Sequence, residues 1–354
     1  MKKLQIILIL LIAALAAGWW FASNWLKAEL PGMLSQALAA EVTLKETNLR
    51  FPLGLELKGI RIAPKTGEPV TADALTVQAN PLSLLSGQPQ VTLELDRPSW
   101  RLHRTAAGFE WPFPTGTPAG GKGGAGVPSK EGKAPPILFT LLSVKNGSLA
   151  LVDEAVQPTV TWSLQPIEVT VRMDPASQSA HWQVQSVVSE GGKEIGAITS
   201  EGEGKLDGSA KGSFKIRHSA LQQLAPYIRP TIGTVPVSGR LTLESRFDLK
   251  QGNLQSDNAI AAEGLVFPEG DETLFGTTGN RMVKLLRDRD GVIRLNIPVS
   301  GRVETPEDWG RLTSAAVQEA LRRALTKTIQ NVLTDKAEQT VGELLNKALE
   351  SINR

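Results

Sequence analysis

The sequence predicts a mainly β protein with an N-terminal transmembrane helix, an elongated and curled antiparallel β-sheet that is groove-like, and C-terminal amphipathic helices. Three observations predict this class: an apolar run over residues 4–26, an alternation of apolar and polar residues that dominates residues 41–303, and apolar residues at helical spacing in residues 304–354. No alternation of strands with long helices is present. The strands are therefore expected to pair antiparallel.

Residues 1–27 are expected to form a membrane anchor. The run from Leu4 to Leu26 is long enough to cross a hydrocarbon core roughly 30 Å thick, because a helix rises about 1.5 Å per residue. The two lysines that precede it favour a cytoplasmic N-terminus, which places the bulk of the chain on the other side of the membrane. A cleaved signal peptide is the alternative, because the alanines near Ala16 offer a cleavage site. Three tryptophans lie where the membrane interface is expected: Trp19, Trp20 and Trp25.

Composition limits the core and the partners. Hydrophobic residues make up 41% of the chain but aromatic residues only 5%, which predicts a thin, aliphatic interior. The 38 basic and 36 acidic residues are interspersed, so no basic stripe indicates a nucleic-acid partner. The absence of cysteine excludes disulfides, thiol catalysis and a lipid-modified cysteine.

The alternating region falls into two parts. Residues 28–111 predict a membrane-proximal region, in which an amphipathic helix over residues 28–40 precedes strands with one apolar face. Residues 112–136 are rich in Pro, Gly, Lys and Ser and predict a flexible linker or loop. Residues 137–303 then predict a β-rich groove region. The apolar residues expected to line the groove are Leu53, Leu55, Leu57, Val169, Val171, Val237, Leu241, Leu243, Leu295 and Ile297.

Two short segments interrupt the strands. Residues 80–87 predict a turn that carries an apolar plug. Ser219 is expected to cap a short helix that runs through Ile228 and is ended by Pro230.

Residues 304–354 predict amphipathic helices, with Thr305 as an N-cap and Pro306 in the first helical position. Leu312, Ala316 and Ala320 begin one apolar stripe. Two interpretations follow: the helices pack on one end of the sheet and cover its edge, or they form a surface that docks on a membrane or on a partner protein.

No constellation of catalytic or ligand-binding residues is found. His103, His181 and His218 lie in separate segments without a second metal ligand at a useful spacing. The motifs of serine hydrolases, zinc proteases and nucleotide-binding loops do not occur. We therefore predict no catalytic, metal-binding or cofactor-binding residues and a protein that is not an enzyme.

Residues 282–301, which read MVKLLRDRDGVIRLNIPVSG, resemble the closing motif of AsmA-like proteins of Gram-negative envelopes, the superfamily that includes TamB. The anchor followed by strands at residues 42–62 is similar to the same superfamily, and so is the segment 81–87 that leads through 95–98 to 102–104. The resemblance implies an inner-membrane anchor, a periplasmic U-shaped β groove, and participation in moving phospholipid toward the outer membrane or in maintaining that membrane. The long C-terminal helices and the shorter chain depart from the family's pattern.

The residues themselves lead to the same hypothesis. A sheet with one aliphatic face and few helices must cover that face with a second wall of sheet or with a lipid chain. The expected partners are phospholipid or another acyl lipid, the inner membrane, and an envelope protein bound by the C-terminal helices, without nucleic acid. The alternative hypothesis is a non-enzymatic assembly or scaffold protein with a closed β core.

Overall fold

The computed structural model describes residues 28–36, 38–64, 67–85, 87–110, 138–190, 192–205, 207–218, 221–270 and 278–303. Between 312 and 326 it describes short helical stretches of one to three residues. Strands account for 62% and helices for 17%, so the prediction of a mainly β protein is confirmed. The chain divides into two compact units, Met1–Lys193 and Glu194–Arg354. This division lies within the region 137–303 that the sequence presents as continuous.

Several predicted segments lie outside the described residues. They are the anchor with Trp19, Trp20 and Trp25, the linker 112–136, and most of residues 304–354. Of the helices in the described ranges, none has both the length and the apolar character that a membrane crossing requires.

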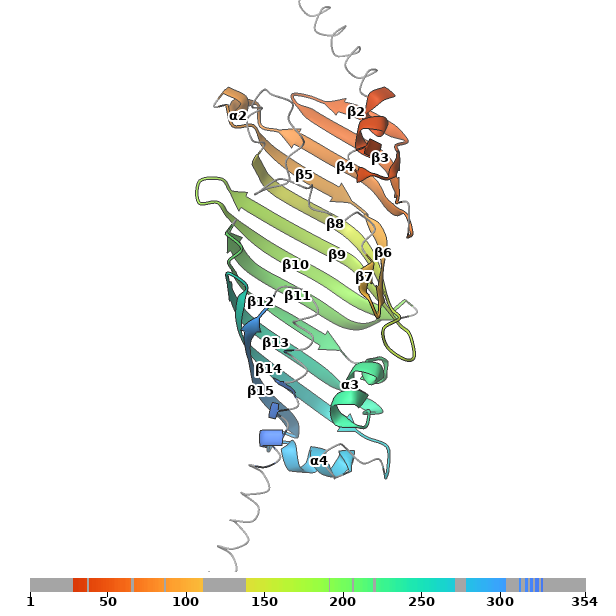
Figure 1. Ribbon diagram of the computed structural model, residues 1–354, viewed down its shortest axis with the longest axis vertical. Coiled ribbons are helices and arrows are strands. Elements are labelled where there is room, and N and C mark those ends of the chain that lie inside the picture. Colours follow the sequence, from red (N-terminus) through yellow and green to blue (C-terminus); the bar gives the residue numbers. More distant parts are fainter. Residues whose placement is uncertain are drawn as a thin grey trace, which may run out of the picture. The chain divides into compact units, whose positions relative to one another are not determined.

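Unit 1 consists of strands that lie side by side in the order β1-β3-β4-β5-β8-β9-β10 (Figure 1). Strand β2 pairs with β3, β7 pairs with β6, and β6 pairs with the second half of β8, whose first half pairs with β5. The strands are β1 (Glu41–Thr43), β2 (Glu46–Arg50), β3 (Gly54–Ala63), β4 (Val70–Ala79), β5 (Gln90–Asp96), β6 (Ser99–Thr105), β7 (Gly108–Glu110), β8 (Leu138–Asp153), β9 (Val160–Asp174) and β10 (Ser179–Glu190).

The prediction of a wholly antiparallel sheet is wrong for β8. This strand runs parallel to β5, with Leu138 opposite Gln90, and parallel to β6, with Leu149 opposite Trp100. Parallel neighbours need a connection of a dozen or more residues, because the chain must return to the end where the first strand began. Residues 111–137 are long enough for that return, and the pattern of alternation carries no information about strand direction.

Bulges keep the apolar residues of β8 and β9 on one face. Val144 lies opposite Val169, Gly147 opposite Ile167, and Leu149 opposite Leu164. Between these pairs β8 has an extra residue, and then β9 has one. An extra residue in one strand shifts the alternation of its side chains by one position. The apolar residues before and after the bulge therefore lie on the same face, although their numbers change from even to odd. This is why the apolar residues of β8 change from even to odd numbers along one continuous strand.

A helix over residues 28–36 packs on the first strands, in agreement with the predicted amphipathic helix. Leu30 and Leu34 contact a cluster formed by Leu57, Ile60 and Ala72. Ser35 joins the helix to β1, because its Oγ donates to the carbonyl oxygen of Pro31 at 2.7 Å and accepts from the backbone N–H of Val42 at 2.9 Å.

The predicted apolar plug after β4 is wrong for Leu82. Residues Pro81–Leu85 form the short helix α2, and the side chain of Leu82 is 74% exposed. Ser83 is the residue that turns inward: its Oγ donates to the carbonyl oxygen of Asn80 at 2.6 Å and accepts from the N–H of Gln90 at 2.8 Å. These bonds satisfy the backbone at the turn into β5 without an apolar side chain.

Unit 2 is a meander of consecutive antiparallel strands. Helices η1 and α3 connect β12 to β13 along the chain, and α4 follows β14 and precedes β15. Figure 1 labels α3 and α4. The elements are β11 (Lys193–Lys205), β12 (Ala210–His218), η1 (Leu221–Leu224), α3 (Ala225–Ile232), β13 (Ser238–Lys250), β14 (Asn253–Val266), α4 (Gly279–Leu286) and β15 (Val292–Arg302).

The helix predicted to end at Pro230 continues beyond it. Helix α3 runs to Ile232, and Gly233 ends it at a φ of 93°, where its N–H donates to the carbonyl oxygen of Arg229 at 2.7 Å. Pro226 lies in the first turn, where a helix tolerates proline, whereas Pro230 lies inside the helix, two residues before its last residue. Helix α4, capped by Thr278, was not predicted.

The C-terminal segment packs on the sheet of unit 2. Leu254, Ile297 and Val299 form a buried cluster on β14 and β15, and the apolar residues Leu312, Ala316, Val317 and Ala320 lie against it. A Cβ atom on Gly301 would approach Leu312 to 2.8 Å. In its described positions, this segment therefore packs on the sheet, as the first of the two interpretations predicts, and its contacts are with the buried face of β14 and β15.

Gly196 allows β11 and β12 to approach closely. A Cβ atom there would lie 2.3 Å from the backbone carbonyl oxygen of Arg217, which a side-chain movement cannot relieve. Gly196→Ala is therefore expected to destabilise this strand pair by about 1–3 kcal/mol. Amide hydrogen exchange of β11 and β12 in the full chain measures the effect. Thr199→Ala, at an exposed position of the same strand, is the control, and equal exchange in both variants would contradict the close approach.

Candidate functional site

Strand pairing in unit 1 aligns apolar side chains into rows that cross six strands. In the first row, each residue lies directly opposite the next, and side chains of directly paired residues share one face of a sheet. The first row is Leu55, Val77, Leu93, Leu142, Val171 and Trp182, and the second is Leu57, Leu75, Leu95, Val144, Val169 and Val184. We call this surface, from β3 to β10, the unit 1 apolar face.

The unit 1 apolar face continues beyond the bulges. Trp100 lies opposite Leu149, and Leu102 opposite Leu151. On the next strands, Leu149 pairs with Leu164 and Leu164 with Val188. The bulges therefore extend the apolar surface along β8 as far as Leu151 instead of ending it.

The opposite face of the same strands is polar. Glu94, Ser143, Thr170 and Gln183 lie directly opposite one another on β5, β8, β9 and β10. Lys145 donates to Glu94 at 2.8 Å, and this hydrogen bond raises the pKa of the Lys145 ammonium group. The sheet thus separates a charged, solvated surface from an apolar one.

Burial of the unit 1 apolar face differs between its two parts. Leu57 is 4% exposed, and its cluster, which helix 28–36 covers, extends as far as Leu95 on β5. Val144, Val169, Val171 and Val184 on β8, β9 and β10 are only half-buried. An apolar surface that keeps contact with water in this way is suited to an apolar ligand or partner.

Unit 2 has a second apolar face, in which one row contains both polar and apolar side chains. Ile198, Ile216, Leu243, Ile260 and Leu295 form an apolar row, and Ser200, Phe214, Ser245, Asn258 and Ile297 form the neighbouring row. Burial is greatest at β14 and β15, under the C-terminal segment, whereas Ile198 and Ile216 are half-buried.

Asn258 is a buried polar residue of the unit 2 face that the sequence did not single out. It is 7% exposed, and its Nδ2 donates to the carbonyl oxygen of Ile297 at 2.9 Å and to Ser256 Oγ at 3.0 Å. Both donors of the amide are thus satisfied, which limits the cost of burial. The only sequence signal is its spacing in Leu254-x-Ser256-x-Asn258-x-Ile260.

The predicted groove residues fall into three groups. Leu57 and Ile297 are buried in the cores of their units, at 4% and 1% exposure. Leu53 and Val237 are exposed at 42% and 46%, Leu53 in the β2–β3 turn and Val237 just before β13. The half-buried residues on the two apolar faces are Leu55, Val169, Val171, Leu241, Leu243 and Leu295.

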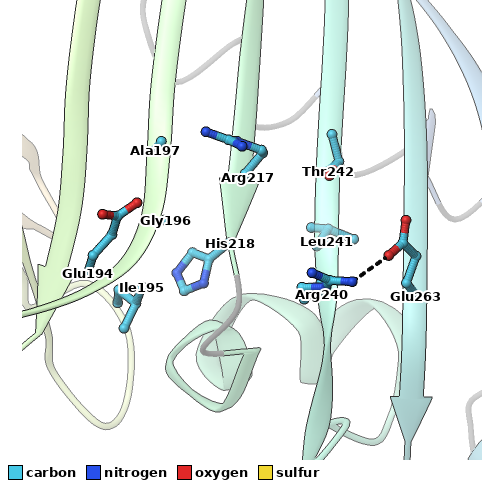
Figure 2. Close-up of a pocket in the computed structure, with 10 residues that line it drawn as sticks. All are labelled: Glu194, Ile195, Gly196, Ala197, Arg217, His218, Arg240, Leu241, Thr242 and Glu263. Atoms are coloured by element: carbon cyan, nitrogen blue, oxygen red, sulfur yellow. Dashed lines mark hydrogen bonds and ion pairs between the residues drawn. The ribbon is translucent and has the colours of Figure 1, made fainter.

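An open hollow of about 720 Å³ lies at one end of the strands of unit 2 (Figure 2). Its charged residues have both signs, and Arg240 donates to Glu263 at 3.0 Å. Its ten lining residues are Glu194, Ile195, Gly196, Ala197, Arg217, His218, Arg240, Leu241, Thr242 and Glu263. Most of them are positions near the ends of β11, β12, β13 and β14.

The other histidines do not assemble a site. His103 Nδ1 lies 3.3 Å from Glu154 Oε1, and His181 is exposed on β10. Among the residues that the structure describes, no group of three or more His, Asp or Glu side chains could hold a metal ion.

The carboxyl groups with the clearest pKa shifts lie in two hairpin turns and on the polar face of unit 2. Hydrogen bonds from the hydroxyl groups of Ser177 and Ser209 lower the pKa of Asp174 and of Asp207, each in a hairpin turn. The hydrogen bond from Lys215 lowers the pKa of Glu244 on the polar face of unit 2. These shifts accompany structural contacts at the surface and lie away from both apolar faces.

Comparison of the chain with models of known protein families finds no match, and comparison with curated proteins finds no matching sequence.

Proposed function

We propose that the chain is an AsmA-like protein, anchored in the inner membrane and facing the periplasm, whose apolar sheet faces bind or conduct phospholipid or another acyl lipid for outer-membrane lipid homeostasis. It performs no reaction. The observation that carries the proposal is the unit 1 apolar face, in which rows of half-buried valine and leucine cross β8, β9 and β10. The predicted anchor, residues 1–27, supplies the location.

Contact of this apolar face with water is unfavourable in free energy. Each Å² of apolar surface removed from water contributes about 25 cal/mol, so a row of valines and leucines favours an apolar cover. An acyl chain is a long, flexible apolar rod that can follow such a row while its head group remains in water. Aliphatic side chains suit this ligand because they offer no competing hydrogen bonds.

An elongated, curled and groove-like sheet is part of the proposal. Bulges bend strands and increase their twist, and the bulges of β8 and β9 lie side by side near Gly147 and Pro166. A bend in neighbouring strands at one level supports a sheet that curls around its apolar side.

The alternative is an assembly or scaffold protein with a closed β core and C-terminal helices that dock a partner. Leu312, Ala316 and Ala320 pack on Leu254 and Ile297 of the same chain, so these apolar residues are already used within the protein. In the described part of the chain, the packed cluster of unit 1 reaches Leu95 on β5 and does not include the half-buried Val169, Val171 and Val184, which favours the lipid-binding proposal.

Photo-crosslinking in intact membranes tests the proposal. A benzophenone amino acid is placed in the full chain at Val171 on the apolar face or, as a control, at the adjacent Thr170 on the polar face. We expect phospholipid adducts, detected by mass spectrometry, at position 171 and far fewer at position 170. Adducts at position 171 that contain only protein would support the scaffold alternative, and equal lipid adducts at both positions would contradict a face-specific site.

A further inference from the structure

Apart from Met33 on the helix over residues 28–36, the exposed large apolar side chains described in unit 1 gather at one end of its sheet. Phe51 is 89% exposed and Leu82 is 74% exposed, and both lie outside the strands. Leu53, Phe139 and Met173, at 42%, 43% and 39%, complete the group. We call these five residues the apolar rim.

Strand register places the rim residues at the same end. The β2–β3 turn holds Phe51 and Leu53, and the carbonyl oxygen of Leu53 accepts from the N–H of Ala79 at the end of β4. Helix α2, with Leu82, follows directly (Figure 1). Phe139 begins β8 and lies opposite Val91, which in turn lies opposite Ala79.

The rim continues into the unit 1 apolar face. Val91 precedes Leu93 by two residues on β5, and Met173 follows Val171 by two residues on β9, so each belongs to the face of its neighbour. An apolar path therefore runs from the exposed end of the sheet to the half-buried rows.

Charged residues are missing from three of the segments that build the rim, whereas Met173 lies between the exposed Arg172 and Asp174. The sequence has none in residues 51–55, 80–93 and 138–144. The opposite end of the sheet differs, because ion pairs lie there between Arg101 and Glu68 and between Arg104 and the buried Asp153. Three charge-free, apolar segments at this end, with ion pairs at the other end, form a distribution that suits insertion into a bilayer, since charged side chains in the membrane are costly.

We propose that the apolar rim inserts into the head-group and upper acyl region of a lipid bilayer and opens the unit 1 apolar face to acyl chains from that bilayer. The insertion stands on the rim alone, whereas the passage of acyl chains rests on the proposed function. The partner is a bilayer because Phe51 in the β2–β3 turn and Leu82 on helix α2 are separate tips, each with most of its side chain in solvent. A deformable bilayer accommodates such isolated tips, whereas a protein partner needs a contiguous, closely packed centre.

The absence of cysteine in the chain makes a direct test of insertion possible. Phe51→Cys and Leu82→Cys are each spin-labelled in the full chain after reconstitution into vesicles of phosphatidylethanolamine and phosphatidylglycerol. Ala106→Cys, at the exposed β6–β7 turn of the same unit, is the matched control. We expect the labels at 51 and 82 to be reached by oxygen dissolved in the bilayer and protected from an aqueous nickel chelate, and the label at 106 to show the reverse. Chelate access at 51 and 82 equal to that at 106 would overturn the proposal.

A second variant separates insertion from lipid binding. Phe51→Glu with Leu82→Glu is expected to lower the phospholipid adducts at position 171 in membranes by at least about tenfold, because the glutamates oppose insertion. The control Ala106→Glu with Ala107→Glu adds the same charge elsewhere and should leave the adducts unchanged. Unchanged adducts in the rim variant would overturn the passage of acyl chains through the rim. Protected spin labels together with a parent chain that gives no lipid adducts would instead overturn the proposed function and leave the insertion standing.

Discussion

Val169→Asp combined with Val171→Asp is expected to abolish lipid binding at the unit 1 apolar face while the protein remains folded. Both valines are half-buried, so the two carboxylates keep contact with water and the free energy of unfolding changes little. An acyl chain laid over them would remove that water. The desolvation of two unpaired charges would then oppose binding.

The measurement uses the same photo-crosslinker at Val144, which lies directly opposite Val169 on β8. Lipid adducts at this position are expected to fall at least about tenfold, because burying even one charge exceeds the few kcal/mol that acyl contact with two valines provides. The thermal midpoint should stay close to that of the parent. Thr170→Asp, on the polar face of the same strand, controls for added charge. Loss of the fold in the double variant would indicate a dry, closed core and support the scaffold alternative.

Ile297→Asp should have the opposite outcome and unfold unit 2. Ile297 is 1% exposed and packs with Leu254 and Val299 beneath the C-terminal segment. The substitution removes a buried aliphatic side chain and places a charge where water does not reach, so we expect destabilisation of roughly 4 kcal/mol or more. The new carboxylate would also lie beside the backbone carbonyl oxygen of its own residue, which in Ile297 accepts a hydrogen bond from Asn258.

Hydrogen exchange of the β13, β14 and β15 amides in the full chain measures this effect strand by strand. Asn296→Asp, at the adjacent exposed position on the polar face, introduces the same carboxylate and should leave exchange unchanged. A folded Ile297→Asp variant with protected amides would show that this position tolerates water, and would refute the buried core.

The strands themselves could be predicted because alternation is a local property. Leu55, Val169, Val171 and Leu243 lie on apolar faces, as their period-two spacing indicates. The same spacing could not separate Leu57 from Val169, although one is buried and the other half-buried. That difference depends on helix 28–36, which covers only the first strands.

The rim illustrates a second limit of sequence patterns. Leu82 was expected to point inward because an apolar residue in a turn is usually buried, yet the hydrogen bonds of Ser83 give the inward position to a polar side chain. Phe51 and Phe139 are far apart in the chain and share an end of the sheet only through pairing. No local pattern could connect them.

The sequence by itself determined which residues are apolar, which of them share a strand face, and where the alternation changes phase at Lys145 and Gln165. Only the tertiary structure decided that β8 runs parallel to β5, so that Leu142 lies opposite Leu93. This pairing joins the apolar residues of β3, β4 and β5 to those of β8, β9 and β10 in one face. The reason is physical: alternation reports the side of a strand, which is set by neighbouring residues. Strand direction and cover depend on contacts between distant segments, which form only when the whole chain packs.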